Sequence, residues 1–171
     1  VGEGRAAPEL FPVGAWATHP LLVAAHVELI RETLATTSAA APIILTAHSL
    51  PRFVIDAGDP YVELFTALTE AISRGRGREV LLAYQSQGDG GGEWIGPALG
   101  EVIAALALGG AKEVIVAPVG FLAEHVETLY DLDIDAREQA SSLGLAFRRV
   151  PALNTHPQLI EAMAALVRDV G

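Results

Sequence analysis

The 171-residue sequence contains no cysteine. This absence excludes disulfide bonds, thiolate metal sites and iron–sulfur clusters held by cysteine, and it is typical of a reducing compartment. Positive charge is also scarce, because 11 Lys and Arg stand against 21 Asp and Glu, a formal net charge of -10. Nucleic-acid binding requires a basic surface. We therefore expect no nucleic-acid partner.

Long hydrophobic runs are missing as well. No apolar run approaches the ~18 residues that a transmembrane helix needs, and no signal-peptide pattern is present. We expect a cytoplasmic protein without a transmembrane segment, either free or peripheral to a membrane. The hydrophobic fraction of 51% excludes a disordered chain and suits one domain with a full-sized core. Residues 1–15 are interpreted as a lead-in from a preceding domain, so the chain is expected to be part of a longer protein.

Short apolar segments alternate with helical patterns along the chain. Segments 42–47, 79–84 and 113–119 are rich in β-branched residues and predict buried parallel strands, and 145–150 is a weaker fourth strand. Helical patterns cover 19–35, 59–72, 96–110 and 156–170. This alternation predicts one α/β domain over residues 1–171, a three-layer α/β/α fold with a four-stranded parallel sheet of Rossmann-like type.

Polar residues follow the first two predicted strands, at the sheet edge where ligands bind in open α/β folds. The motif AHSLP places His48 and Ser49 after the first strand. The second strand is followed by QSQGDGGGEWIGP, with Gln85, Ser86 and Trp94, and we expect its GDGGGE stretch to be a flexible loop. An imidazole, an amide and an indole are therefore expected to converge at one edge.

The third predicted strand is followed by an acidic stretch, GFLAEHVETLYDLDID (120–135). Six carboxylates and one arginine, Arg137, lie between residues 124 and 138. On an ideal helix five of these carboxylates share an arc of about 80°: Glu124, Glu127, Asp131, Asp135 and Glu138. The opposite face carries Val126, Leu129, Leu132 and Ala136, which we expect to pack on the sheet.

This acidic row allows two interpretations. It is either the solvated face of an amphipathic helix or a ladder of carboxylates that passes a divalent cation toward a site. Like charges four residues apart destabilise a helix by about 0.2–0.5 kcal/mol per pair, and no cation is interleaved in the row. The missing countercharge favours cation handling, but the residues alone leave both interpretations open.

The five histidines differ in what they predict. His48 is equally compatible with a loop residue and with a ligand. The role of His125 depends on where the helix begins: in an extended segment it points the same way as Glu127, whereas in a helix it falls among apolar residues. His19, His26 and His156 are interpreted as structural.

Five separated motifs resemble the ferrochelatases, enzymes that insert ferrous iron into a porphyrin at the end of haem synthesis. They are AHSLP (47–51), GDPY (58–61), YQS with WIGP (84–97), PVGFLAEHVETLYDLDID (118–135) and RVPALN (149–154). The PVGF form and the long spacing between QS and Trp94 are most similar to the bacterial branch that uses coproporphyrin rather than protoporphyrin.

The resemblance implies a role for each matched residue. His48 and Glu127 would be the catalytic pair on opposite sides of the ring, and both would contact Fe²⁺, the substrate metal. Asp131 and Asp135 would lead metal inward or hold a second divalent ion. The porphyrin substrate would be contacted by Ser49, Gln85, Ser86 and Trp94. The family's acidic segment also contains a widened helical turn.

The chain departs from the family in one respect, because it matches only the C-terminal of two α/β halves. The resemblance therefore implies a partner, the N-terminal half of the same enzyme. Arg52 is the only basic residue in the candidate loops. One arginine supplies little positive charge for binding an acidic porphyrin. Two alternatives stay open: a cobalt chelatase of the sirohydrochlorin type, which acts as a homodimer, and a non-catalytic module that binds a tetrapyrrole or a metal.

Overall fold

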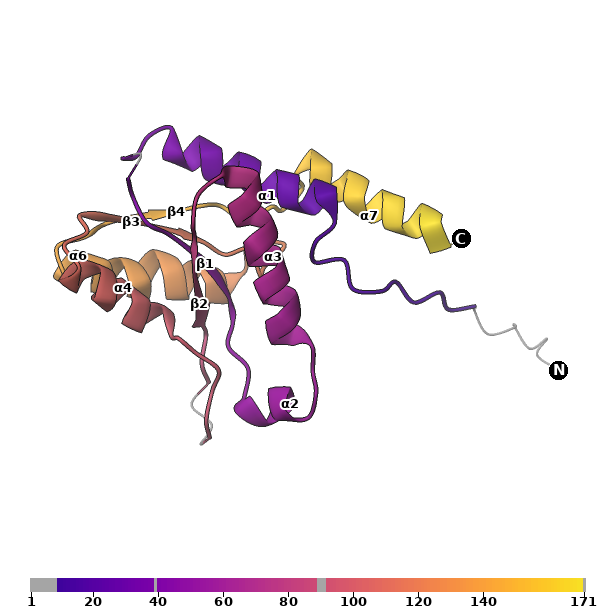
Figure 1. Ribbon diagram of the computed structural model, residues 1–171, viewed down its shortest axis with the longest axis horizontal. Coiled ribbons are helices and arrows are strands. Elements are labelled where there is room, and N and C mark those ends of the chain that lie inside the picture. The colour runs from indigo at the N-terminus through magenta and orange to yellow at the C-terminus, as the bar shows by residue number, and fades with distance from the viewer. Residues whose placement is uncertain (1–8, 39, 89–91, 171) are drawn as a thin grey trace.

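Four parallel strands form the centre of the protein in the computed structural model, which describes residues 9–38, 40–88 and 92–170 (Figure 1). The strands are β1 (Ile43–His48), β2 (Leu81–Gln85), β3 (Glu113–Ala117) and β4 (Ala146–Arg149). They pair in the order β2-β1-β3-β4, and every pairing is parallel. The carboxyl ends of all four strands therefore open at the same edge of the sheet.

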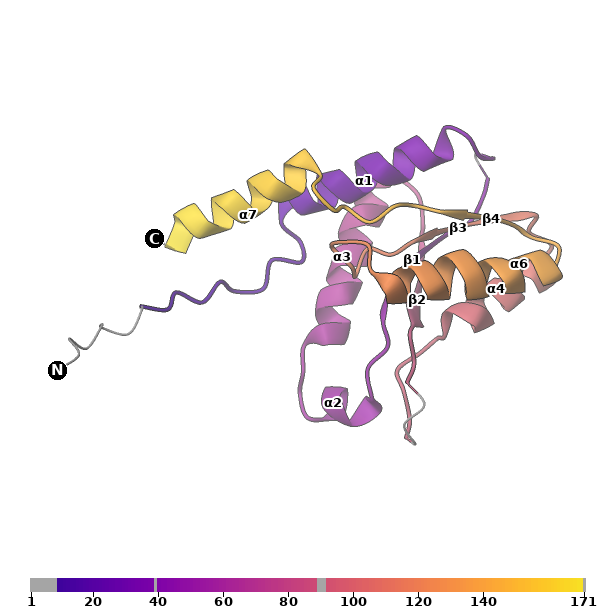
Figure 2. The same cartoon turned by 180° about the vertical axis from the view of Figure 1, so that it is seen from behind.

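Helices cover both faces of this sheet. The helical elements are α1 (Pro20–Leu34), α2 (Arg52–Asp56), α3 (Tyr61–Arg76), α4 (Leu99–Leu108), α5 (Val126–Tyr130), the π-helix η1 (Asp131–Ala136), α6 (Arg137–Ser142) and α7 (Pro157–Val170). Helices α1 and α3 pack on one face, and α4, η1 and α6 pack on the other (Figures 1 and 2). Helix α7 packs against α1. In the described ranges, no helix is both long and apolar enough to cross a membrane.

The alternation of side chains along β1 positions the functional edge. Ile43, Leu45 and Ala47 belong to the core beneath α1 and α3, whereas Ile44 belongs to the core beneath α4 and η1. Successive strand side chains point to opposite faces, so Thr46 and His48 lie on the face of Ile44. The last side chain of β1 is thus presented to the acidic segment.

The predicted α/β/α architecture is confirmed, with strand limits that differ from the predicted ones by one or two residues. Helix α3 runs four residues further than predicted and ends where Gly77 adopts φ 67°, a left-handed conformation that glycine adopts without steric cost. Helix α2 was not predicted, because five residues are too few to show a periodicity. The GDGGGE loop lies partly outside the described residues.

The acidic stretch folds into α5, η1 and α6 in succession. The π-helix confirms the widened turn that the family resemblance implies. Leu132 and Ala136 are buried against the sheet as expected, but Val126 is 81% and Leu129 42% exposed. The expectation that all four pack on the sheet was wrong, because the helical wheel assumed one α-helical angle throughout, and a π-helix turns less per residue.

Candidate functional site

His48 and Glu127 face each other at the carboxyl edge of the sheet. Nε2 of His48, the last residue of β1, lies 3.4 Å from Oε1 of Glu127 in the first turn of α5. Nδ1 of the same imidazole contacts the backbone oxygen of Ser49. A carbonyl oxygen only accepts, so Nδ1 carries a proton, and Nε2 is the ring atom that faces the carboxylate oxygen. Two acceptor atoms that face each other need a proton or a metal cation between them.

His125 lies on the other side of Glu127. Its backbone is extended (φ -148°, ψ 171°) and it precedes the first residue of α5, so it points the same way as Glu127. Nδ1 of His125 is 4.0 Å from Oε2 of Glu127, and its ring packs 5.2 Å from that of Phe121. Each carboxylate oxygen therefore has an imidazole nearby. Among the described residues, however, no three or more His, Asp or Glu side chains are grouped closely enough to hold a metal ion.

An arginine that sequence reasoning missed divides the acidic segment in two. Arg149, at the end of β4, donates to Glu124 at 2.6 Å and to Asp133 at 2.9 Å. Arg137 also donates to Asp133, at 3.1 Å. Partial burial acts to raise the pKa of Asp133, but the hydrogen bonds and charges of the two arginines outweigh it and hold that pKa below its usual value.

The expectation of an acidic row without countercharge was therefore wrong for Glu124. Its carboxylate also accepts from the backbone N–H of Ala152 at 2.9 Å, so it fixes the loop after β4 rather than facing a ligand. Glu127, Asp131 and Asp135 form no ion pair with an arginine or lysine among the described residues. Glu138, the fifth member of the row, likewise has no arginine or lysine partner among the described residues, so four carboxylates of the row are unpaired with a basic side chain.

Asp131 and Asp135 line a pocket of about 310 Å³ between η1 and the loop after β2. The hydroxyl of Ser86 donates to Oδ2 of Asp131, and Ser86 itself has a left-handed φ of 61°. Non-glycine residues in this conformation are uncommon and cluster at functional sites. The pocket is thus lined by carboxylates on the side of η1 and by Gln85 and Ser86 on the side of β2.

The remaining predicted residues surround the site at different depths. Ser49 is fully buried, and its hydroxyl donates to the carbonyl of Ile95 at 2.8 Å. Gln85 is 5% exposed. Trp94 is half-buried and pairs with Pro51 in an isolated antiparallel bridge, so its loop is tied to the one after His48.

Two contacts that sequence reasoning did not assign, one from Gly120 and one from Tyr61, hold this edge of the sheet together. Gly120 donates its N–H to the carbonyl of Thr46 at 2.9 Å, and a Cβ at Gly120 would lie 2.5 Å from that of Ala47. The Tyr61 hydroxyl donates to the His48 carbonyl at 2.8 Å, and burial, with the nearby Tyr84, raises the pKa of Tyr61 to about 12. The loop before the acidic segment thus sits directly on β1.

The histidines interpreted as structural do have structural contacts. Nδ1 of His19 accepts from the N–H of Leu21 at the start of α1, and Nδ1 of His156 accepts from that of Gln158 at the start of α7. His26 is buried within α1.

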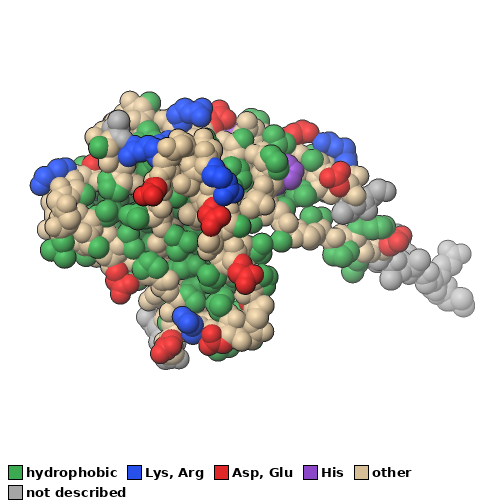
Figure 3. Space-filling view, in the orientation of Figure 1, with side chains coloured by type: hydrophobic (Ala, Val, Ile, Leu, Met, Phe, Trp, Pro, Cys, Tyr) green, Lys and Arg blue, Asp and Glu red, His purple; other side chains and the backbone are tan. Residues whose placement is uncertain are grey.

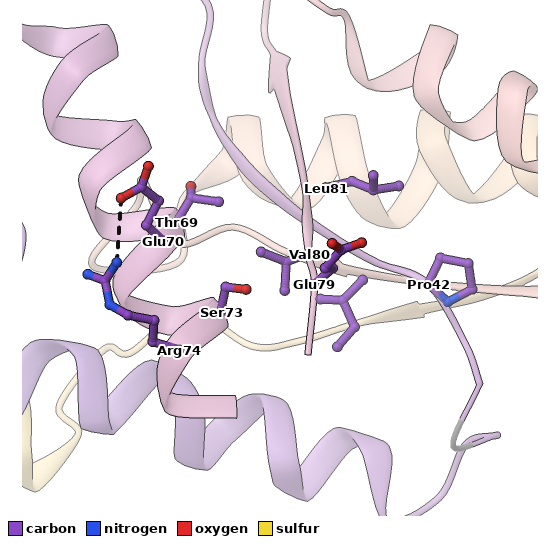
Figure 4. Close-up of a pocket in the computed structure, with 9 residues that line it drawn as sticks. Pro42, Thr69, Glu70, Ser73, Arg74, Glu79, Val80 and Leu81 are labelled. Carbon is purple, nitrogen blue, oxygen red and sulfur yellow. Dashed lines mark hydrogen bonds and ion pairs between the residues drawn. The ribbon is translucent and has the colours of Figure 1, made fainter. Parts of the chain in front are cut away.

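A larger hollow, of about 520 Å³, lies at the opposite end of the sheet (Figure 4). It lies between the start of β2 and the end of α3. Arg74 and Glu70 pair there at 3.5 Å, and no histidine lines the hollow. The chemistry-bearing side chains are therefore gathered at the carboxyl edge, not in the larger hollow.

The family model for ferrochelatase matches residues 1–170. The chain belongs to the ferrochelatase family. It is 42% identical over 163 residues to a ferrochelatase of Picosynechococcus sp., an alignment that covers 92% of this chain and 42% of the relative. It is 39% identical over 171 residues to a ferrochelatase of Geotalea uraniireducens, which covers 98% of this chain and 53% of the relative.

The chain thus spans about half the length of the curated ferrochelatases that it matches. The family match does not favour the cobalt-chelatase alternative.

Proposed function

We propose that the full-length protein inserts Fe²⁺ into a porphyrin, with His48 and Glu127 at the reaction centre. The observation that carries this proposal is the 3.4 Å approach of the His48 imidazole and the Glu127 carboxylate, in a chain of the ferrochelatase family. Both side chains are partly exposed, 35% and 44%, so a flat macrocycle can reach them.

Metal insertion requires two pyrrole N–H protons to leave the ring as the cation enters. The imidazole of His48 can accept one of these protons at Nε2, and the Glu127 carboxylate can accept the other, before both are released to solvent. Carboxylate oxygen and imidazole nitrogen are both ligands that Fe²⁺ accepts. At 3.4 Å the two side chains leave no room for a ring between them. We therefore propose that both act from one face of the macrocycle, where together they can hold the incoming metal, instead of from opposite sides of the ring as the resemblance implies.

Asp131 and Asp135 form the outer part of the proposed metal path. They line the polar pocket beside the pair, and two carboxylates there can hold a hydrated divalent ion before it reaches Glu127. Ser86 and Trp94 are the proposed contacts of the macrocycle. Because Ser49 and Gln85 are buried, we propose that they support the site instead of contacting the macrocycle directly.

We further propose that the rest of the full-length protein, an N-terminal half, closes the site. Arg52 is paired with Asp56 at 3.5 Å, and the projection that α2 forms at the bottom of Figure 3 carries acidic side chains beside its basic one. Val126, Tyr130 and Ile134 leave an apolar row exposed beside the carboxylates. The missing half would cover this row and supply basic groups for the carboxylates of the porphyrin, coproporphyrin or protoporphyrin.

The test measures metal insertion by the full-length protein under anaerobic conditions, with coproporphyrin and with protoporphyrin as substrates. The reaction is monitored through the change in porphyrin absorbance. We expect His48→Ala and Glu127→Gln each to lower kcat by at least about a hundredfold. Glu32→Gln, on the exposed side of α1, is the matched control and should keep the rate of the parent. If both site variants keep near-parental rates and metal affinity, the assignment of the reaction centre is wrong.

A further inference from the structure

A chain of three side-chain hydrogen bonds runs from the middle of the sheet to Asp131. The hydroxyl of Thr46 on β1 donates to Oε1 of Gln85 at 2.7 Å. Nε2 of Gln85 lies 3.5 Å from the hydroxyl of Ser86, which donates to Oδ2 of Asp131. Thr46 is 0% and Gln85 5% exposed, so water does not compete freely for the inner bond.

The carboxylate sets the direction of every bond in this chain. An ionised carboxylate only accepts, so Ser86 must donate its one proton to Asp131. The Ser86 oxygen can then accept only from the NH₂ group of Gln85, which leaves the carbonyl oxygen of Gln85 for Thr46. Thr46 must donate in its turn. The amide of Gln85 therefore has one orientation that satisfies both of its neighbours.

The strand pairing connects this chain to the reaction centre. Thr46 lies two residues before His48 on the same face of β1, and Gln85 is the parallel partner of His48 across the β1–β2 pairing. The chain thus fixes the Asp131 carboxylate of η1 relative to the strand that carries His48. It also holds Ser86 in its left-handed conformation, which costs on the order of 1 kcal/mol when nothing compensates it.

We infer that Thr46 and Gln85 are positioning residues for the metal path, and that they act through Ser86 on Asp131. The inference rests on the proposed function, because it assigns Asp131 to the incoming cation. The hydrogen bond uses only Oδ2, so Oδ1 can bind a cation while the carboxylate is held in one orientation. Without the Thr46 hydroxyl, the Gln85 amide can turn, Ser86 loses its donor, and the carboxylate no longer has a fixed direction.

The experiment compares Thr46→Val with Thr46→Ser in the full-length protein, with Fe²⁺ under anaerobic conditions as the varied substrate. Valine keeps the shape of threonine without the hydroxyl, and we expect the KM for Fe²⁺ to rise about five- to tenfold, the effect of one lost hydrogen bond. The KM for the porphyrin should stay within about twofold of the parent, and serine should restore the KM for Fe²⁺. A general loss of folding would not separate the two substrates in this way.

Thr69→Val is the matched control. Thr69 is a buried threonine of α3 whose hydroxyl donates within its own helix, to Phe65 at 2.9 Å. Its loss should leave both KM values unchanged. If Thr46→Val does not fold, Gln85→Met breaks the same chain of hydrogen bonds at the next residue. The KM values for Fe²⁺ and for the porphyrin are then measured for this variant.

A double-mutant cycle with Ser86→Ala tests whether the residues act in series. If they do, Thr46→Val adds nothing to the KM for Fe²⁺ once Ser86→Ala is present. A KM for Fe²⁺ within about twofold of the parent in Thr46→Val, or full additivity in the cycle, overturns the inference. A parent protein that does not metallate porphyrin at all overturns the proposed function instead, so the two failures are distinguishable.

Discussion

His26 is buried within α1, and its burial predicts a loss of stability in mild acid. The imidazole is 5% exposed, and its Nε2 atom has no hydrogen-bond partner among the residues that the structure describes. Burial, and then the nearby His156, lower the pKa of His26 from 6.5 to about 4. His156 also lies 3.7 Å, through its Nε2, from a carboxylate oxygen of Glu28.

The size of the effect follows from the two pKa values. Between pH 6.5 and about 4 the unfolded chain binds a proton at His26 that the folded protein does not bind. The free energy of unfolding therefore falls as the pH falls, by about 1.4 kcal/mol per pH unit and by about 3.5 kcal/mol over the whole window. The full contribution is present above pH 6.5. The loss is a large share of a typical domain stability of about 5–15 kcal/mol.

Urea denaturation followed by circular dichroism, at several pH values across this window, measures the effect. His26→Leu removes the titrating group at similar size and should remove most of the pH dependence, whereas His125→Gln, at an exposed histidine, should keep it. Histidine NMR signals provide a direct check, since those of His26 should stay in the neutral form to about pH 4. The reasoning is refuted if His26 titrates near its ordinary pKa, or if His26→Leu loses as much stability in acid as the parent.

Two further substitutions test the contacts that hold the acidic segment against the sheet. Arg149→Gln removes the positive charge that bridges two partly buried carboxylates. It should therefore lower the free energy of unfolding, measured by urea titration, by about 2–3 kcal/mol. Arg148→Gln, at the exposed neighbour, should cost less than about 0.5 kcal/mol, and equal losses would contradict the bridging role. Gly120→Ala places a methyl group against Ala47 and should lower the melting temperature by several degrees, about 1–3 kcal/mol. Gly14→Ala, with nothing within 4 Å, should be neutral; a neutral Gly120→Ala would show that the close approach is unimportant.

The fold was predictable because its determinants are local. The segment PIILTA (42–47) is short, rich in β-branched residues and apolar on both faces, as a strand covered by helices on two sides must be. Helix α1 begins at Pro20, and the N–H of Tyr61 at the start of α3 donates to Asp59, which are start signals local to the sequence. The alternation of the two kinds of segment then leaves few topologies.

The contacts of the site were less predictable because they join distant parts of the chain. Arg149 lies 25 residues from Glu124 and 16 from Asp133, and a helical wheel contains only local neighbours. In the sequence Thr46 is one more β-branched residue in an apolar strand, and nothing marks its hydroxyl until β2 places Gln85 beside it. The family resemblance supplied the widened turn of η1, which no wheel of ideal angles predicts.

The π-helix η1 has a consequence for chain length. A π-helix holds about one residue more per turn than an α-helix, so the stretch from Asp131 to Ala136 behaves as a one-residue insertion in an otherwise continuous helix. Deleting one residue there would let a regular α-helix form with almost the same axis, and α6 would keep its orientation relative to Glu127, because the wide turn absorbs the extra residue. The backbone would still span the sheet, and the change would be confined to η1 itself, which carries Asp131 and Asp135. The extra residue of η1 therefore changes the directions of the carboxylates inside the wide turn without changing the direction of α6.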